Sequence, residues 1–120
     1  MSKNIDKGKS GEEIAADYLR KKGFKILHRN WRYSRCGEID IIASDRDTLV
    51  FIEVKARSSS NFGHPSESVN RTKIEKIRTL AGLYLNENPE NQFHKFRFDA
   101  VGVILGSKPE ISYYKDIYQF

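Results

Sequence analysis

The chain has 120 residues, of which 38% are hydrophobic and 31% charged, so it can bury a sizeable core. Its formal charge of +5 favours a polyanionic partner, and its single cysteine, Cys36, excludes an intramolecular disulfide. No apolar run approaches the ~18 residues that span a bilayer, and no secretory signal is visible, so we expect no membrane partner and a cytoplasmic location. We expect a flexible basic tail over residues 1–8 and one domain over residues 9–120.

A first helix is predicted to begin after Ser10, a good N-cap, and to end at Gly23. Its buried stripe comprises Ile14, Ala15, Tyr18 and Leu19. Helical spacing places Glu12 at the edge of this stripe, aimed at the rest of the fold, and Glu13 on the solvent side. The alternative role for Glu12 is to complement the helix dipole, and both roles are compatible.

Residues 18–37 contain no acid but carry basic and aromatic side chains. The basic ones are Arg20, Lys21, Lys22, Lys25, Arg29, Arg32 and Arg35. Guanidinium groups beside aromatic rings are typical of nucleic-acid binding. The alternative is a solvated helix end followed by an edge strand, residues 24–32, whose aromatic side chains face the core. We favour the core for Phe24, and the nucleic-acid role for Arg32 and Arg35. On this strand Phe24, Ile26 and His28 are expected on one face.

The centre of the chain, residues 37–57, predicts two β-branched strands joined by a short charged turn. The apolar positions are Ile39, Ile41, Val50, Ile52 and Val54, and they alternate with acidic positions. A two-residue loop at Arg46–Asp47 places Asp40 opposite Glu53, whereas a four-residue loop places Glu38 there. Either loop keeps Asp40 and Glu53 on one face, but a three-residue loop separates them unless a bulge intervenes.

A second helix is predicted from Ser66 or Ser68 to Leu85, after a long loop over residues 57–67. Its buried arc comprises Ile74, Ile77, Leu80, Ala81, Tyr84 and Leu85. Lys73 falls inside this arc, so its ammonium group needs an acid or a phosphate to contact, or must extend to solvent.

The last third of the chain predicts a strand over residues 93–105 and an edge strand over residues 111–118. Asp99 is expected to be buried and to pair with Arg97 or Arg57 rather than to do chemistry. The element order is therefore helix, three strands, helix, and one or two strands. This order predicts an α/β fold with a mixed β-sheet flanked by helices.

The acidic strands have the composition of a divalent-metal site. Mg²⁺ or Mn²⁺ takes oxygen ligands, which Asp40, Glu53 and the backbone carbonyl of Val54 would supply. Such an ion polarises a phosphoryl oxygen and lowers the pKa of a bound water, while Lys55 can stabilise the charge that develops. The candidate nucleic-acid-binding residues are Arg29, Arg32, Arg35, Arg57 and Lys73.

These residues resemble a known family. Asp40 followed by Glu53-Val54-Lys55 resembles the Asp…(Asp/Glu)-x-Lys core of restriction-endonuclease-like nucleases. The segments that complete the resemblance are Gly8–Leu19, Arg29–Arg32, Gly37–Asp40, Phe51–Arg57, Lys73 and Arg97–Asp99. Together they resemble the bacterial YraN-type family, uncharacterised protein family 0102, which is related in fold to archaeal Holliday-junction resolvases.

The resemblance implies a restriction-endonuclease-like core and metal-dependent cleavage of DNA. By position, Asp40 and Glu53 would hold the metal, Lys55 would be the catalytic lysine, and Glu12 an outer or second-metal acid. One departure is Ile39, which stands where restriction enzymes often have a proline before the first acid.

Two functions stay open at this point. The first is an endonuclease that hydrolyses DNA phosphodiesters, with branched or junction DNA as a candidate substrate and a homodimer as a candidate assembly. The second is a non-cleaving nucleic-acid-binding accessory module in DNA repair, recombination or uptake. The complete set of Asp40, Glu53 and Lys55 favours the first, because a protein that no longer cuts would be free to lose Lys55.

Overall fold

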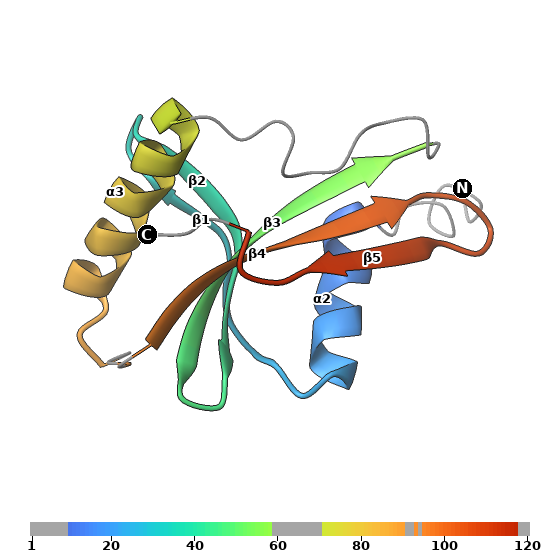
Figure 1. The fold of residues 1–120 in the computed structure, drawn as a ribbon, viewed down its shortest axis with the longest axis horizontal. Coiled ribbons are helices and arrows are strands. Elements are labelled where there is room, and N and C mark those ends of the chain that lie inside the picture. Colours follow the sequence, from blue (N-terminus) through green and yellow to red (C-terminus); the bar gives the residue numbers. More distant parts are fainter. Residues whose placement is uncertain (1–9, 59–70, 91–92, 94, 118–120) are drawn as a thin grey trace.

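The computed structural model describes residues 10–58, 71–90, 93 and 95–117 (Figure 1). Its elements are α2 (Gly11–Lys21), β1 (Lys25–Tyr33), β2 (Gly37–Asp45), β3 (Thr48–Arg57), α3 (Arg71–Glu87), β4 (Lys95–Ile104) and β5 (Glu110–Tyr114). The predicted order is thus confirmed, including the last edge strand. The expected tail at residues 1–8, most of the loop at 57–67, and the helix starts at Ser66 or Ser68 lie outside the described residues.

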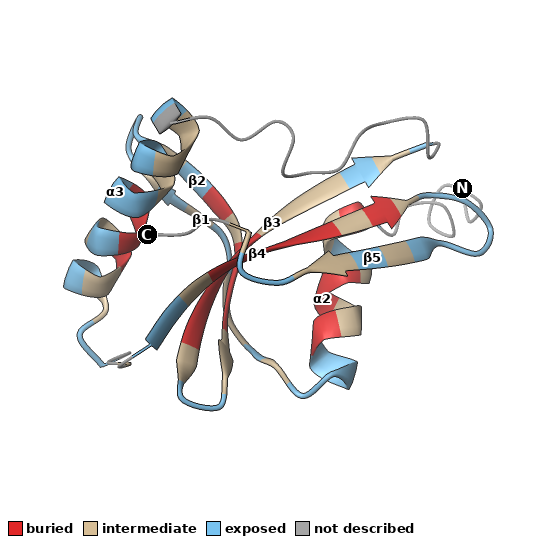
Figure 2. Cartoon of the chain, viewed as in Figure 1, coloured by how far each residue is buried: buried red, intermediate tan, exposed pale blue. Residues whose placement is uncertain are grey.

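The five strands form one sheet in the order β1-β2-β3-β4-β5. Strands β3 and β4 are parallel and the other neighbours antiparallel, which makes the sheet mixed, as predicted. Alternate residues of β3 enter two cores: Val50 and Ile52 pack with α2, whereas Leu49 and Phe51 pack with α3. Side chains alternate across a strand, so the two helices cover opposite faces of the sheet. Figure 2 shows the buried residues where the strands converge and on the inner sides of both helices.

Helix α2 is fixed against the sheet at its first turn. The Ser10 hydroxyl accepts a hydrogen bond from the backbone N–H of Glu13, and the Glu13 carboxylate accepts one from the backbone N–H of Ser10, forming a capping box. A Cβ atom on Gly11 would lie 2.4 Å from Cβ of Ala56 in β3, so only glycine allows this approach. The helix ends as predicted, with Gly23 at a φ of +97° just beyond its C-cap.

The central hairpin has the register of the two-residue loop. Ile41 pairs with Ile52 and Asp45 with Thr48, which leaves Arg46–Asp47 as the turn. Arg46 has a φ of +60°, as tight hairpin turns require. Extending this register by one residue places Asp40 opposite Glu53, so the alternative with Glu38 in that place is excluded.

The two central strands separate beside these acids. The β2–β3 ladder ends at the Ile41–Ile52 pair; beyond it β2 stays with β1 to Gly37, and β3 stays with β4 to Arg57. Figure 1 shows the two ribbons diverging, β1 and β2 toward α3 and the other strands past α2. We call this divergence the strand fork. Asp40 and Glu53 are the first residues inside it.

Two side chains lie on a different face from the one predicted. The ladder of β1 shifts by a bulge between Ile26 and His28, and His28 consequently stacks edge-on against Tyr84 of α3, at 5.2 Å between ring centroids. Ile39 packs in the α3 cluster although Ile41 packs with α2.

The second change follows from an irregular β1–β2 ribbon. Arg29 pairs with Ile41 and Trp31 with Ile39, so Asn30 falls opposite Asp40. Asn30 has a φ of +53°, a conformation that interrupts the alternation of an extended strand. No sequence pattern marks that residue as irregular, and the predicted face of Ile39 was therefore wrong.

Helix α3 buries the predicted arc and ends at Glu87, two residues beyond Leu85. Asp99 is buried and paired with Arg97, as predicted. Neither described helix is long and apolar enough to cross a membrane.

Candidate active site at the strand fork

Asp40 lies across the fork. Its Oδ2 accepts a hydrogen bond of 2.8 Å from the backbone N–H of Val54, which has lost its ladder partner on β2. Burial raises the pKa of the Asp40 carboxyl, and the carboxylates of Glu12, Glu53 and Glu38 raise it further, while the bond from Val54 opposes them. Asp40 is therefore fixed in place and crowded by negative charge.

Glu53 is held by two lysines. Its Oε2 lies 2.9 Å from Nζ of Lys73 in α3 and 3.4 Å from Nζ of Lys55 in the same strand. All three side chains are about three-quarters buried, with 24–28% of each exposed. Of the alternatives that the sequence leaves open for Lys73, the structure shows contact with an acid, and this contact joins the sheet and α3.

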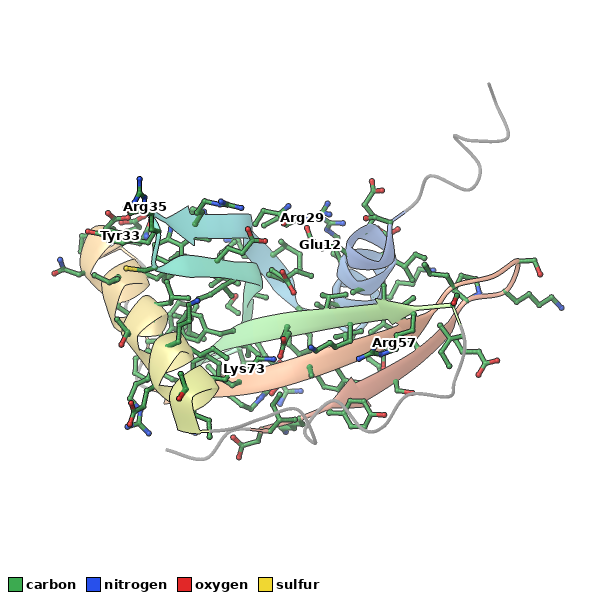
Figure 3. The ribbon with its side chains drawn as sticks, turned by 90° about the horizontal axis from the view of Figure 1, so that it is seen from above. Glu12, Arg29, Tyr33, Arg35, Arg57 and Lys73 are labelled. Carbon is green, nitrogen blue, oxygen red and sulfur yellow. The ribbon has the colours of Figure 1, made fainter. Side chains whose placement is uncertain are left out.

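Glu12 also points to the sheet, as its helical position predicts. Its Oε1 accepts hydrogen bonds from Arg29 Nη2 at 3.0 Å, Arg29 Nε at 3.2 Å and Asn30 Nδ2 at 2.8 Å. Figure 3 shows Glu12 and Arg29 side by side, between α2 and the β1–β2 ribbon. Glu12 is thus positioned by β1, close enough to Asp40 to affect its pKa.

A cavity of about 210 Å³ opens between the fork and α3. Asp40, Glu53 and Lys73 line it together, so the two acids open into one cavity. Its other lining residues are Gly37, Glu38, Ile39, Phe51, Ile52, Lys76, Ile77, Leu80, Phe98 and Asp99. We call it the fork cavity. It combines charged groups with an apolar wall, as ligand sites commonly do.

Lys76 is a lysine of the cavity lining for which the sequence predicted no role. A Cβ atom on Gly37 would lie 3.0 Å from Cε of Lys76 and 3.6 Å from its Nζ, so the lysine runs across the start of β2. Helical spacing three residues after Lys73 was the available signal, since that offset keeps two side chains on one side of a helix.

The donors fit a hard divalent cation. Asp40 and Glu53 offer carboxylate oxygens, which Mg²⁺ and Mn²⁺ prefer, and the crowding at Asp40 is the kind that a cation relieves. Within the described ranges no three His, Cys, Asp or Glu side chains gather closely enough to hold a metal. An ion would therefore be held by two carboxylates, completed by backbone or water oxygen, and Glu12 would act beyond the first ligands.

The predicted nucleic-acid-binding residues do not form one patch. Nη2 of Arg32 lies 2.6 Å from Oε1 of Glu38, and Arg29 forms an ion pair with Glu12. Figure 3 places Arg35 and Arg57 toward opposite ends of the molecule. Trp31 stacks edge-on against Tyr84 and therefore serves the core. Only Lys73, of this predicted set, lines the fork cavity.

A second charged cluster lies on β4 and β5, and its central residue, Asp99, is also among the residues that line the fork cavity. Asp99, whose side chain is fully buried, accepts hydrogen bonds from Arg97, from the Tyr113 hydroxyl and from the backbone N–H of Asp116. Burial lowers the pKa of Arg97, but its bonds to Asp99 and Tyr113 outweigh this and raise it. We call this group the β4–β5 cluster.

Comparison with known proteins shows a family match over most of the chain, including the residues that line the fork cavity. The family model of Uncharacterised protein family UPF0102 matches residues 11–103. A UPF0102 protein of Rhodococcus opacus is 41% identical over 120 residues, covering 98% of this chain and 100% of its own. That of Acetivibrio thermocellus is 46% identical over 110 residues (92% and 84%), and that of Dictyoglomus thermophilum 44% over 108 residues (90% of each).

One solved structure is similar in outline, that of Pyrococcus furiosus SfsA in complex with Ca²⁺. It is 16% identical, and the match covers 93% of this chain and 63% of that chain. Its TM-score of 0.38 is too low to support an inference.

Proposed function

We propose that this chain, which belongs to Uncharacterised protein family UPF0102, is a metal-dependent endonuclease that hydrolyses DNA phosphodiesters. The observation that carries the proposal is the strand fork. It directs Asp40 and Glu53 into one cavity, with Lys55 and Lys73 in contact with Glu53. This combination of oxygen donors and ammonium groups suits a phosphodiester, which needs its charge neutralised as it is attacked.

The roles of the residues follow from their contacts. Asp40 and Glu53 would hold Mg²⁺ or Mn²⁺, which when bound polarises a phosphoryl oxygen and lowers the pKa of water. The N–H of Val54 keeps Asp40 directed across the fork. The backbone carbonyl of Val54 is the further ligand that the sequence suggests.

Lys55 and Lys73, which both contact Glu53, have different roles in this proposal. Lys73 lies closer to Glu53, at 2.9 Å, and comes from a separate element, so it positions the carboxylate. Lys55 is more loosely held, at 3.4 Å, and can turn to a phosphate oxygen on which charge develops. Removal of Lys55 should therefore affect the rate more than metal binding.

DNA as the substrate is supported by the net charge of +5 and by the exposed Arg32 and Arg35 on the β1–β2 ribbon. Branched or junction DNA, and action as a homodimer, extend this proposal on the strength of the family resemblance. The competing function, a non-cleaving nucleic-acid-binding module, requires the same basic residues but not the acids.

A cleavage assay with Mn²⁺ tests the proposal on linear, nicked, flapped and four-way DNA. Wild-type protein should cut at least one of these, and Asp40→Asn and Lys55→Ala should reduce the rate about a hundredfold or more. Asp47→Asn and Lys108→Ala, both at exposed positions, are the matched controls and should cut at the wild-type rate. If none of the substrates is cut while DNA is still bound, the non-cleaving module is correct.

A further inference from the structure

The fork cavity has a part that metal-dependent hydrolysis does not use. Beyond Asp40 and Glu53 the cavity extends to α3. Its apolar wall there is formed by Ile77 of α3 and by Ile39 of β2. Ile39 is nearly buried, with 6% exposed, and Ile77 is half-buried, so the wall is recessed rather than flat. A recess of this kind accepts a flat or compact group that enters from outside, not the continuous surface of a double helix.

The edge of the cavity carries the ammonium group of Lys76, an exposed residue of α3. Lys76 forms no ion pair with any other residue in the part of the chain that the structure describes. Its neighbour Lys73, one turn earlier, instead contacts Glu53 at 2.9 Å. The ammonium group of Lys76 is therefore available to an anion from outside, at the point where the recess opens.

Gly37 makes room for this arrangement. A side chain at this position would meet Cε of Lys76 at 3.0 Å and Leu80 at 3.3 Å, and its φ of +133° disfavours other residues. The absence of a side chain thus lets the lysine reach from α3 to the opening of the fork. A purely solvated lysine needs no such space.

We propose that the fork cavity is a subsite for one unstacked nucleotide, whose phosphate meets Lys76 and whose base enters the recess beside Ile39 and Ile77. This inference rests on the proposed nuclease site, because the same cavity holds Asp40 and Glu53. It specifies the substrate as DNA from which a nucleotide can leave the stack easily, such as DNA at a nick, flap or junction. Leaving the stack costs least where pairing or stacking is already interrupted.

The geometry explains why the substrate must be open. Asp40 lies inside the fork, and its bond to Val54 faces the strands rather than solvent. A phosphodiester that reaches both acids must bring its own nucleotide into the cavity. Intact duplex DNA keeps that nucleotide stacked, so it should bind only to the exposed basic residues.

The experiment uses a nicked duplex with 2-aminopurine, a base whose fluorescence rises when it unstacks, next to the nick. An intact duplex with the label at the same position is the reference, and EDTA is present so that no cutting occurs. Wild-type protein should raise the fluorescence of the nicked duplex alone. Lys76→Ala should weaken binding of that duplex about tenfold, close to the value of one charged contact.

A pair of variants on α3 isolates the recess. Ile77→Phe fills it and should abolish the fluorescence rise, whereas Leu85→Phe lies on the same helix outside the cavity and should leave it intact. Lys76 is exposed, so Lys76→Ala provides the test even if Ile77→Phe does not fold.

Three results would overturn the inference: equal binding of intact and nicked duplex with no fluorescence change, no binding of either DNA, or the same rise in Ile77→Phe and Leu85→Phe. The nuclease proposal is tested separately, by measuring DNA cleavage with Mn²⁺. A fluorescence rise without cleavage refutes that proposal alone, and cleavage of intact duplex without a rise refutes only the subsite.

Discussion

The fork cavity and the β4–β5 cluster each contain an aspartate of the same sheet, Asp40 and Asp99. The two carboxylates differ in how many hydrogen-bond donors and cations surround them. Asp99 is enclosed and receives bonds from Arg97, Tyr113 and a backbone N–H. Asp40 is partly open and accepts one backbone bond, while three other carboxylates raise its pKa after burial has already done so. A buried acid with all its bonds made stabilises a fold, whereas a crowded acid in a cavity indicates a ligand.

The strongest test of this difference is Asp99→Asn. This change leaves the Arg97 guanidinium buried without its main charge partner, so the free energy of unfolding should fall by about 3–5 kcal/mol. Urea unfolding monitored by circular dichroism measures it. Asp47→Asn, at an exposed turn position, is the control and should unfold as the wild type does. Replacing Arg97 and Asp99 together by leucine should recover part of the loss, and a loss as large as that of Asp99→Asn would refute the pairing argument.

The next largest effect is stabilisation by metal. Mg²⁺ or Mn²⁺ at about a hundred times its Kd should raise the free energy of unfolding by about 2.7 kcal/mol, because it binds only the folded protein. Asp40→Asn should lose this increase, whereas Asp47→Asn, at an exposed position outside the cavity, should keep it. Thermal unfolding with and without the ion is the measurement. An equal increase in Asp40→Asn would place any metal elsewhere.

A smaller effect is the pH dependence that Asp40 confers. Its folded-state pKa lies above the ordinary value of 3.8, so the folded protein binds the proton more tightly than the unfolded chain. The contribution to stability is complete below that ordinary value and is lost as the pH rises through the folded-state pKa. Without metal, wild type should therefore lose stability relative to Asp40→Asn as the pH rises from about 4 to neutrality. A difference that does not change over this range would show that Asp40 is not crowded.

The smallest effect on stability is expected for Lys73→Met. The pair with Glu53 is about one-quarter exposed, so its loss should cost less than about 1 kcal/mol. The metal affinity should change much more, because Glu53 loses the contact that positions it. Calorimetric titration with Mn²⁺, compared between Lys73→Met and the exposed Lys115→Met, measures this. Unchanged affinity would assign Lys73 a structural role.

Much of the site was visible in the sequence because its residues follow regular periods. Of the loop lengths that the sequence left open, the structure has the two-residue turn, whose register runs to the Ile41–Ile52 pair beside Asp40 and Glu53. Helical spacing directed Glu12 and Lys73 to the sheet, and each meets a charged partner there. These predictions depend only on local geometry, which is repeated in every helix and hairpin.

The predictions that failed depend on irregular backbone. A bulge moves His28 to the α3 face of the sheet. The irregular backbone at Asn30, with its φ of +53°, lies beside the point where Ile39 packs toward α3 and Ile41 toward α2. The basic run before the hairpin also suggested a nucleic-acid surface, but Arg29 is taken by Glu12. Charge along a sequence shows which groups are present, and only their contacts show which are engaged.

The sequence by itself determined the element order and the mixed α/β class, and it limited the central hairpin to a few registers. These follow from side-chain periodicity and turn length, which act over a few residues. The tertiary structure decided that β2 and β3 separate at those acids, and that α3 brings Lys76 across Gly37 to close a cavity there. Both depend on where segments distant in sequence meet, because the packing of a helix on a twisted sheet is set by the whole core and not by any one segment.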